Sequence, residues 1–264
     1  MKRVPWTGFD VFLFLAIWLA PLFVSIATAS IVSLKPPHVE ATAGDATVSE
    51  ATASDVQDHG HPIAQLIAQS EHSLAILLLA FFAGVVVASI VEEFLFRMLF
   101  QGWLEATFRQ HHVPYGSGMA IVIVALCFSA IHISNNDAVD VATLKNGFIV
   151  SSVYSLMVFT AGVIYLTQVR NVRIADYFIG TEKFFRPGFF MGAGCCLLVM
   201  VFCFELFVVL KTIYPNTNVA PIPLFFFALA LGVLYSRTQN LSYCMLLHAC
   251  LNGTSLMLVW FGMG

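Results

Sequence analysis

The fold of this chain is decided by a stretch that runs from Ser73 to Arg97 and reads SLAILLLAFFAGVVVASIVEEFLFR. No residue from Ser73 to Ile90 is charged, and an apolar run of this length is typical of a transmembrane α-helix. Three ionisable side chains follow, Glu92, Glu93 and Arg97. Charged groups at membrane depth are costly, and they usually face a protein interior or a wet cavity and have a functional role. The stretch therefore predicts a transmembrane helix that carries a polar site.

The composition extends this prediction to the whole chain. Of the 264 residues, 59% are hydrophobic and 10% are charged, and the mean hydropathy is +0.86. A soluble domain would carry roughly a quarter charged residues. Repeated apolar runs of about twenty residues also favour helices over the shorter, alternating strands of a barrel. The sequence thus predicts an all-α fold, a polytopic transmembrane helical bundle with a membrane-embedded polar site.

We expect about seven spans, near residues 8–34, 74–92 (continuing as helix to 108), 118–133, 146–168, 188–212, 220–236 and 241–262. Residues 35–72 are rich in Ala, Thr, Ser, Asp and His and lack the large apolar side chains needed to bury a core. The predicted organisation is therefore an N-terminal transmembrane helix (1–34), a flexible extramembrane loop (35–72) and a core (73–264) with an extended region at 146–215.

Basic residues predict the orientation. Three lie on one side of the expected topology (Lys35, Lys145, Lys211), and eight lie in the N-terminal tail and the alternate loops (Lys2, Arg3, Arg109, Arg170, Arg173, Lys183, Arg186, Arg237). The positive-inside rule then places the N-terminus in the cytoplasm, and the C-terminus outside, of a bacterial cytoplasmic membrane. In this topology His132 lies near the outer end of its span and Glu92 near the inner end of its own. This difference in depth would be explained if the helix that bears the glutamates is long and tilted, or if one span is miscounted.

Helical spacing divides the roles of the first motif. Glu93 and Arg97 are four residues apart and share a helix face, so we expect them to form an ion pair that braces the helix. Glu92 is turned roughly 100° from Glu93 and is left free for chemistry. A carboxylate in a partly desolvated site suits a general base.

Two further motifs place polar residues in apolar surroundings, Phe128-Ser-Ala-Ile-His132 and His248-Ala-Cys-Leu-Asn252. If the three helices converge, Glu92 and His132 could activate a water while His248 and Asn252 stabilise an oxyanion. Each motif alone has a structural alternative, because intramembrane histidines often serve as helix–helix hydrogen-bonding groups and charged sets can form ion-pair networks. The combination favours a catalytic site.

The motifs Glu92-Glu93-Phe-Leu-Phe-Arg97, Phe128-x-x-x-His132 and His248-x-x-x-Asn252 together resemble the three signatures of the CPBP family, the CAAX-protease and bacteriocin-processing intramembrane proteases. The resemblance covers roughly residues 75–135 and 225–260, and implies a CPBP-like protease core within 73–264.

This resemblance also implies a role for each site residue. Glu92 and His132 would activate the water, and His248 and Asn252 would stabilise the oxyanion. Structural support would come from three residues, Glu93, Arg97 and Phe128. The chain departs from the family pattern at Met98, where glycine is common, and the region 146–215 lies outside the resemblance.

The expected function is that of an integral-membrane endopeptidase of the glutamate type. It would hydrolyse a peptide bond of a membrane-associated protein or peptide, CAAX-type or related. The alternative is a non-catalytic membrane scaffold or an immunity protein that keeps the CPBP fold. A small transporter is disfavoured because no inverted repeat is apparent in the sequence.

No cofactor is expected, and no residue is assigned as a metal ligand. The alternative is a metal-dependent peptidase, because one glutamate and two histidines could hold zinc. Against it, the H-E-x-x-H pattern is absent and asparagine is a poor zinc ligand. The expected partners are a membrane protein or peptide substrate and the lipid bilayer. The net charge of −3 and the lack of a basic patch argue against nucleic acid.

Overall fold

The computed structural model describes residues 5–33, 73–133, 141–178, 187–214 and 217–261, so the predicted loop 35–72 lies outside the described residues. Within the described residues every regular element is a helix, as predicted. The elements are α1 (Gly8–Ser33), α3 (Leu74–Ala80), the π-helix η1 (Phe81–Val87), α4 (Ala88–Glu93), the π-helix η2 (Phe94–Gln101), α5 (Gly102–Gln110), α6 (Gly116–Ile131), α7 (Val141–Ile164), the π-helix η3 (Tyr165–Val169), α8 (Ala175–Phe178), α9 (Pro187–Ile213), α10 (Pro221–Thr238) and α11 (Leu241–Trp260).

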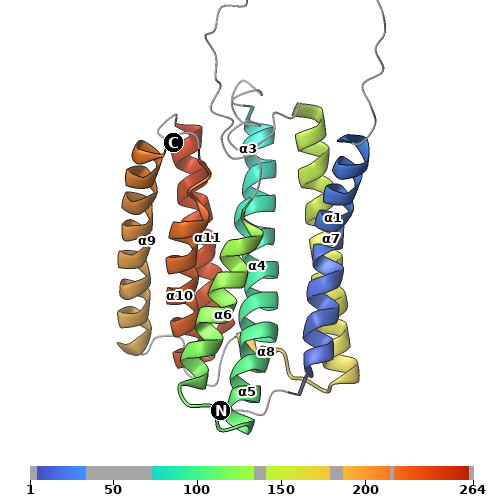
Figure 1. The fold of residues 1–264 in the computed structure, drawn as a ribbon, viewed down its shortest axis with the longest axis vertical. Helices are drawn as coiled ribbons and strands as arrows, with labels where there is room; N and C mark the ends of the chain where they lie inside the picture. Colours follow the sequence, from blue (N-terminus) through green and yellow to red (C-terminus); the bar gives the residue numbers. More distant parts are fainter. Residues whose placement is uncertain (1–4, 34–72, 134–140, 179–186, 215–216, 262–264) are drawn as a thin grey trace, which may run out of the picture.

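The long helices stand side by side and alternate in direction along the chain (Figure 1). Helix α1 begins at the lower end of the bundle in this view, and α11 ends at the upper end. Each predicted span coincides with a helix, and only the short α8 was not predicted. The architecture is thus the all-α membrane bundle that the composition indicates.

Four helices in the described part of the chain are long and apolar enough to cross a bilayer. They are Leu74–Gln110, Lys145–Val169, Pro221–Thr238 and Leu241–Trp260. Gly8–Pro21 and Gly116–Ile131 are apolar but shorter. These lengths follow from the sequence, since uninterrupted apolar runs can satisfy all their backbone groups only within a helix.

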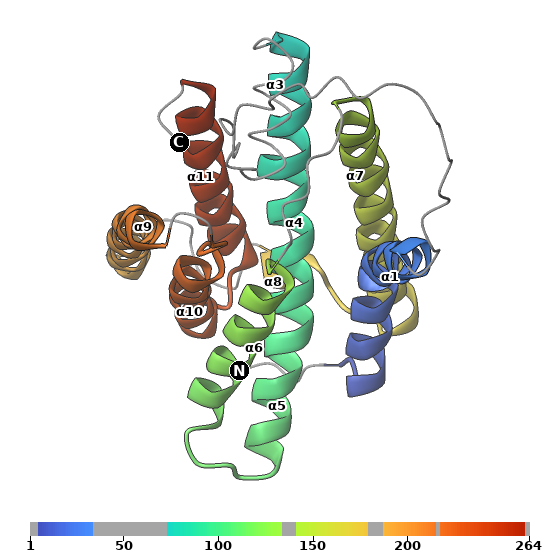
Figure 2. The ribbon, with the colours of Figure 1, turned by 45° about the horizontal axis from the view of Figure 1, so that its top comes forward.

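A central rod, formed by α3, η1, α4, η2 and α5, positions the polar motif (Figure 2). It is a single run of 37 residues, Leu74–Gln110. At about 1.5 Å per residue, the rod is much longer than the roughly 30 Å hydrocarbon core of a bilayer. Glu92 is the middle residue of the rod and does not lie near either end. The helix that bears the glutamates is therefore long. A long helix is one of the two explanations given above for how Glu92 and His132 could meet despite their different positions in the predicted topology.

Helix α6 has only 16 residues and ends beside the middle of the rod (Figure 1). Its C-cap residue is His132. The short α6 and the long rod thus bring His132 and Glu92 to similar depth, although each lies in a different part of its own helix.

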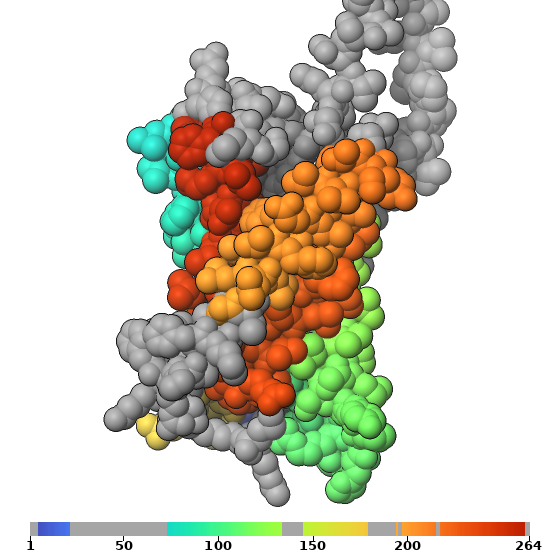
Figure 3. Space-filling model, turned by 90° about the vertical axis from the view of Figure 1, so that its left-hand side faces the viewer, coloured from blue at the N-terminus to red at the C-terminus, as the bar shows by residue number. Residues whose placement is uncertain are grey.

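Aromatic contacts surround the rod. All eight residues of η2 are buried. The Phe94 ring lies 5.0 Å from the Phe159 ring of α7, and the Phe96 ring lies 5.3 Å from the Phe128 ring of α6. On the opposite flank, α9 covers part of α10 and α11 (Figure 3). Because η2 is enclosed on every side, any polar group on it must find its partners inside the protein.

Helix α1 is held to the core by polar contacts that the motif analysis did not predict. The buried Asp10 carboxylate accepts hydrogen bonds from Arg170 at 2.5 Å and from the Tyr165 hydroxyl at 2.6 Å. The Trp6 indole donates to the Leu99 carbonyl oxygen at 3.0 Å. These contacts fasten the N-terminal end of α1 to the lower part of the bundle.

Candidate active site

Side chains from three helices meet around one carboxylate at the centre of the bundle. Glu92 Oε2 lies 3.9 Å from Nε2 of His132 and 3.9 Å from Nε2 of His248. The ring of Phe128 lies 4.7 Å from the His132 ring and 5.7 Å from the His248 ring. The convergence that the motifs required is therefore present for Glu92 and both histidines.

Glu93 is fully buried and joins two residues. Its Oε2 accepts a hydrogen bond from Arg97 Nε at 3.1 Å, which is the ion pair expected from the spacing. Its Oε1 lies 2.9 Å from His248 Nδ1, a contact that the sequence did not predict. A carboxylate beside a guanidinium is ionised and can only accept, so the proton of this second bond lies on Nδ1 of His248. The Nε2 atom of His248 is the one that faces Glu92.

The tautomer of His132 follows from a similar contact. Its Nδ1 lies 2.8 Å from the carbonyl oxygen of Phe128, which can only accept, so Nδ1 carries the proton. In the neutral ring, Nε2 then presents its lone pair toward Glu92. The C-terminal turn of α6 thus orients the imidazole through a backbone carbonyl that the end of the helix leaves available.

Glu92 Oε2 is buried, and within the described residues it has no hydrogen-bond partner. The two imidazole nitrogens at 3.9 Å are too far away for direct hydrogen bonds. Buried polar atoms are nearly always paired with protein or with ordered water. The arrangement therefore suits a small hydrogen-bonding molecule held between a carboxylate and an imidazole.

Access to this centre differs among its members. The side chain of His132 is 29% exposed and that of Glu92 is 13% exposed, whereas that of His248 is 3% exposed. The site thus opens on the side of His132 and is closed on the side of His248.

Asn252 lies one turn beyond His248, and its carboxamide is hydrogen-bonded to the backbone of η1. Its Nδ2 donates to the carbonyl oxygen of Gly84 at 2.8 Å. Because α11 runs antiparallel to the rod, residues after His248 meet η1 rather than α4. The carboxamide retains a second N–H, which the bond to Gly84 does not use.

Phe128 and Arg97 pack against each other behind the histidines. The guanidinium carbon of Arg97 lies 5.8 Å from the centre of the Phe128 ring. Arg97 Nη1 and Nη2 are buried, and neither has a hydrogen-bond partner within the described residues. The ring of Phe128 therefore contacts both imidazoles and the guanidinium, a position that suits structural support.

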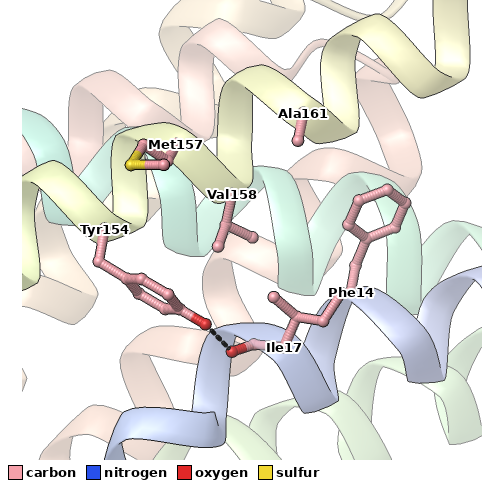
Figure 4. A pocket seen from close by; sticks show the side chains of 6 residues that line it. All are labelled: Phe14, Ile17, Tyr154, Met157, Val158 and Ala161. Atoms are coloured by element: carbon pink, nitrogen blue, oxygen red, sulfur yellow. Dashed lines mark hydrogen bonds between the residues drawn. The ribbon is translucent and has the colours of Figure 1, made fainter.

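The described residues contain no group of three or more His, Cys, Asp or Glu arranged to hold a metal ion. An apolar cavity of about 230 Å³ lies between α1 and α7, where the Tyr154 hydroxyl donates to the Ile17 carbonyl (Figure 4). Its lining contains none of the candidate catalytic residues and consists of Phe14, Ile17, Tyr154, Met157, Val158 and Ala161.

A family model described as type II CAAX prenyl endopeptidase Rce1-like matches residues 74–175 and 180–254. The match includes all seven predicted site residues and extends through most of 146–215, which the motif resemblance had left outside. Comparisons with curated proteins and with solved structures give no match. The matched residues make up well over half of the chain, and with its apolar helices they identify an integral membrane protein. The chain belongs to the Rce1-like family of type II CAAX prenyl endopeptidases.

Proposed function

We propose that this protein is an integral-membrane endopeptidase that hydrolyses a peptide bond with a water activated by Glu92. Its substrate would be a membrane-associated protein or peptide, CAAX-type or related. The observation that carries the proposal is that two imidazole Nε2 atoms lie 3.9 Å from one carboxylate oxygen, Glu92 Oε2, which has no hydrogen-bond partner within the described residues. Membership of a CAAX endopeptidase family supports the reaction class.

In the proposed reaction, the water lies between Glu92 Oε2 and His132 Nε2. Glu92 removes one proton while the water oxygen bonds to the scissile carbonyl carbon, and the carbonyl oxygen becomes an oxyanion. The same proton then passes from Glu92 to the leaving nitrogen as the C–N bond breaks. His132, fixed by the Phe128 carbonyl, orients the water through its lone pair.

We assign stabilisation of the oxyanion to His248. Its Nδ1–H donates a hydrogen bond to the Glu93 carboxylate, and in the imidazolium form its Nε2 also carries a proton that it can donate to the oxyanion. Arg97 in turn holds Glu93. A preorganised donor in a site of low dielectric stabilises developing charge far more than it would in water. Asn252 would add a second donor through the N–H that Gly84 does not use.

The test uses the full-length protein in lipid vesicles, with membrane-anchored peptides that end in prenylated or unprenylated CAAX sequences. Products are followed by mass spectrometry. Glu92→Gln is expected to lower turnover by about 10²–10⁴-fold, the usual contribution of a general base. Losses are likewise expected for His132→Ala and His248→Ala.

The matched control is Glu205→Gln, which makes the same chemical change at an exposed position of α9 and is expected to leave turnover unchanged. Wild-type rates in Glu92→Gln would overturn the proposed role of Glu92. A wild-type protein that cleaves no peptide of the panel would favour the non-catalytic scaffold instead.

A further inference from the structure

A row of buried polar residues follows one face of the rod beyond the proposed site. From Glu93 toward the C-terminal end, every fourth residue is polar or charged: Glu93, Arg97, Gln101 and Glu105. Their exposed fractions are 0%, 0%, 0% and 4%. Buried polar groups are costly at membrane depth unless they are hydrogen-bonded, and such residues usually have a function. The proposed reaction uses only the first two.

The π-helix explains how the row stays on one face. In an α-helix of 3.6 residues per turn, residues four apart drift around the axis in one sense. A π-helix, with i→i+5 bonds, has more residues per turn, so the same spacing drifts in the opposite sense. Because η2 (Phe94–Gln101) is π-helical and its neighbours α4 and α5 are α-helical, the two drifts offset each other. The row therefore stays on one side of the rod, where Glu93 contacts His248 of α11 and Gln101 contacts Gly232 of α10.

At the far end of the row, Gln101 and Glu105 are hydrogen-bonded to each other and to α10. Gln101 Nε2 donates to Glu105 Oε1 at 2.9 Å and to the Gly232 carbonyl oxygen of α10 at 2.9 Å. Ser236 of α10 also hydrogen-bonds to Glu105. Two acceptors on the amide nitrogen fix the orientation of the Gln101 carboxamide.

Between the two bonded ends, complementary atoms lack partners. Arg97 Nη1 and Nη2 are donors, and Gln101 Oε1, on the next turn, is an acceptor; all three are buried without a hydrogen-bond partner within the described residues. Buried polar atoms of this kind are commonly joined by an ordered water that makes two to four hydrogen bonds. One such water would satisfy the guanidinium and the carboxamide together.

We propose that Gln101 and Glu105 are positioning residues for the peptidase, and that an ordered water between Gln101 and Arg97 connects them to Glu93 and His248. This inference rests on the proposed function. The water holds the Arg97 guanidinium in one orientation, Arg97 holds the Glu93 carboxylate, and Glu93 holds the His248 ring. Small displacements of such a group can lower a rate by about 10²-fold.

Two variants distinguish this positioning role from a purely structural one, in which Gln101 only binds α10 through Gly232. Gln101→Met removes both the acceptor toward Arg97 and the donors toward Glu105 and Gly232. The double variant Gln101→Glu/Glu105→Gln keeps an acceptor at position 101 toward Arg97. It also keeps the hydrogen bond between positions 101 and 105, with the donor now at position 105. Of these contacts it loses only the bond to Gly232. We expect Gln101→Met to lower kcat by about 10-fold to 100-fold with KM unchanged, and the double variant to recover most of kcat.

A residue that only clamps α10 would behave differently. Both variants lose the bond to Gly232, so equal losses of kcat in the two would overturn the proposal. Glu205→Gln again serves as the control and is expected to leave kcat and KM unchanged.

A second measurement does not depend on turnover. An experimental structure of the full-length protein, at a resolution that shows ordered water, is expected to place one within hydrogen-bonding distance of Arg97 Nη and Gln101 Oε1. Dry packing between these groups would overturn the proposal even if Gln101→Met fails to fold. Lack of turnover in the wild type, with the water present, would overturn the proposed function alone.

Discussion

At the scale of single residues, two adjacent glutamates occupy different environments. Glu93 is bonded to Arg97 and His248 inside the bundle, whereas Glu92 faces the partly exposed His132 and has no direct hydrogen bond at Oε2 within the described residues. The difference arises because consecutive residues point about 100° apart around a helix. These environments support the proposed division, in which Glu93 has a structural role and Glu92 acts in catalysis.

This division predicts opposite effects on stability from the same substitution. Glu93→Gln leaves the buried Arg97 without its counter-ion and is expected to lower the free energy of unfolding by about 3–5 kcal/mol. Glu92→Gln removes a carboxylate that has no cationic partner in direct hydrogen-bonding contact, and is expected to unfold at or above the wild-type temperature. Thermal unfolding in detergent micelles compares the two variants. Equal destabilisation would contradict the distinct environments.

A chelator tests the proposed metal-free chemistry at the same scale. Because the proposal assigns activation of the water to Glu92 and His132 alone, turnover is expected to be unchanged after incubation with a strong zinc chelator. The measurement is the rate of peptide cleavage before and after dialysis. A loss of activity that added Zn²⁺ restores would show instead that Glu92, His132 and His248 act as metal ligands.

At the scale of elements, close approach between helices decides whether the polar row can form. Gly232 lets α10 approach both α6 and the rod: a Cβ added there would lie 2.8 Å from Cγ2 of Ile121 in α6 and 3.2 Å from Oε1 of Gln101 in the rod. By contrast, a Cβ at Gly118 of α6 would meet nothing within 4 Å. The two glycines therefore have different structural importance, although both lie within helices.

Gly232→Ala is expected to lower the free energy of unfolding by about 1–3 kcal/mol, since overpacking forces neighbouring side chains to move. Gly118→Ala is the matched control, and we expect it to leave stability unchanged or to raise it by up to about 1 kcal/mol through helix propensity. Unfolding midpoints of both variants in the same detergent provide the comparison. An unchanged unfolding midpoint in Gly232→Ala would show that α10 can shift away from Ile121 without loss of stability.

At the scale of the whole molecule, the basic helix ends lie together. The C-terminal ends of α5, η3 and α10, near Arg109, Arg170 and Arg237, lie at the end of the bundle where α1 begins (Figure 1). The end of α11 lies opposite. This arrangement supports the proposed cytoplasmic N-terminus, because positive charge is enriched on the cytoplasmic side.

Reporter fusions test this orientation. Alkaline phosphatase is active only outside the cytoplasm, so a fusion after α11 is expected to be active and one after α10 inactive. The reverse pattern would show that the bundle is inserted the other way.

The attachment of α1 to the family core gives a further prediction. Arg170→Gln removes the charged partner of the buried Asp10, and we expect faster hydrogen exchange in the first turns of α1 with little change in the central rod. Arg237→Gln, at an exposed position of α10, is the control. Unchanged exchange in α1 would show that Trp6 and the apolar contacts hold the helix without the ion pair.

The sequence by itself determined the helices, the membrane class and the Glu93–Arg97 pair. Each of these depends on neighbours within a few turns of one helix, where backbone geometry alone sets the distances. The motifs also identified Glu92, His132 and His248 as candidate site residues. That their three helices converge was an assumption, which the sequence could not test.

Only the tertiary structure decided which residues meet across helices. The contacts of His248 with Glu93 and of Asn252 with Gly84 join residues 155 and 168 positions apart. They depend on the depth, rotation and direction of rigid helices, which the packing of whole faces sets and no local spacing records. For the same reason the bond between Asp10 and Arg170, and the alignment of Gln101 with Glu105 against α10, became visible only once the helices were assembled.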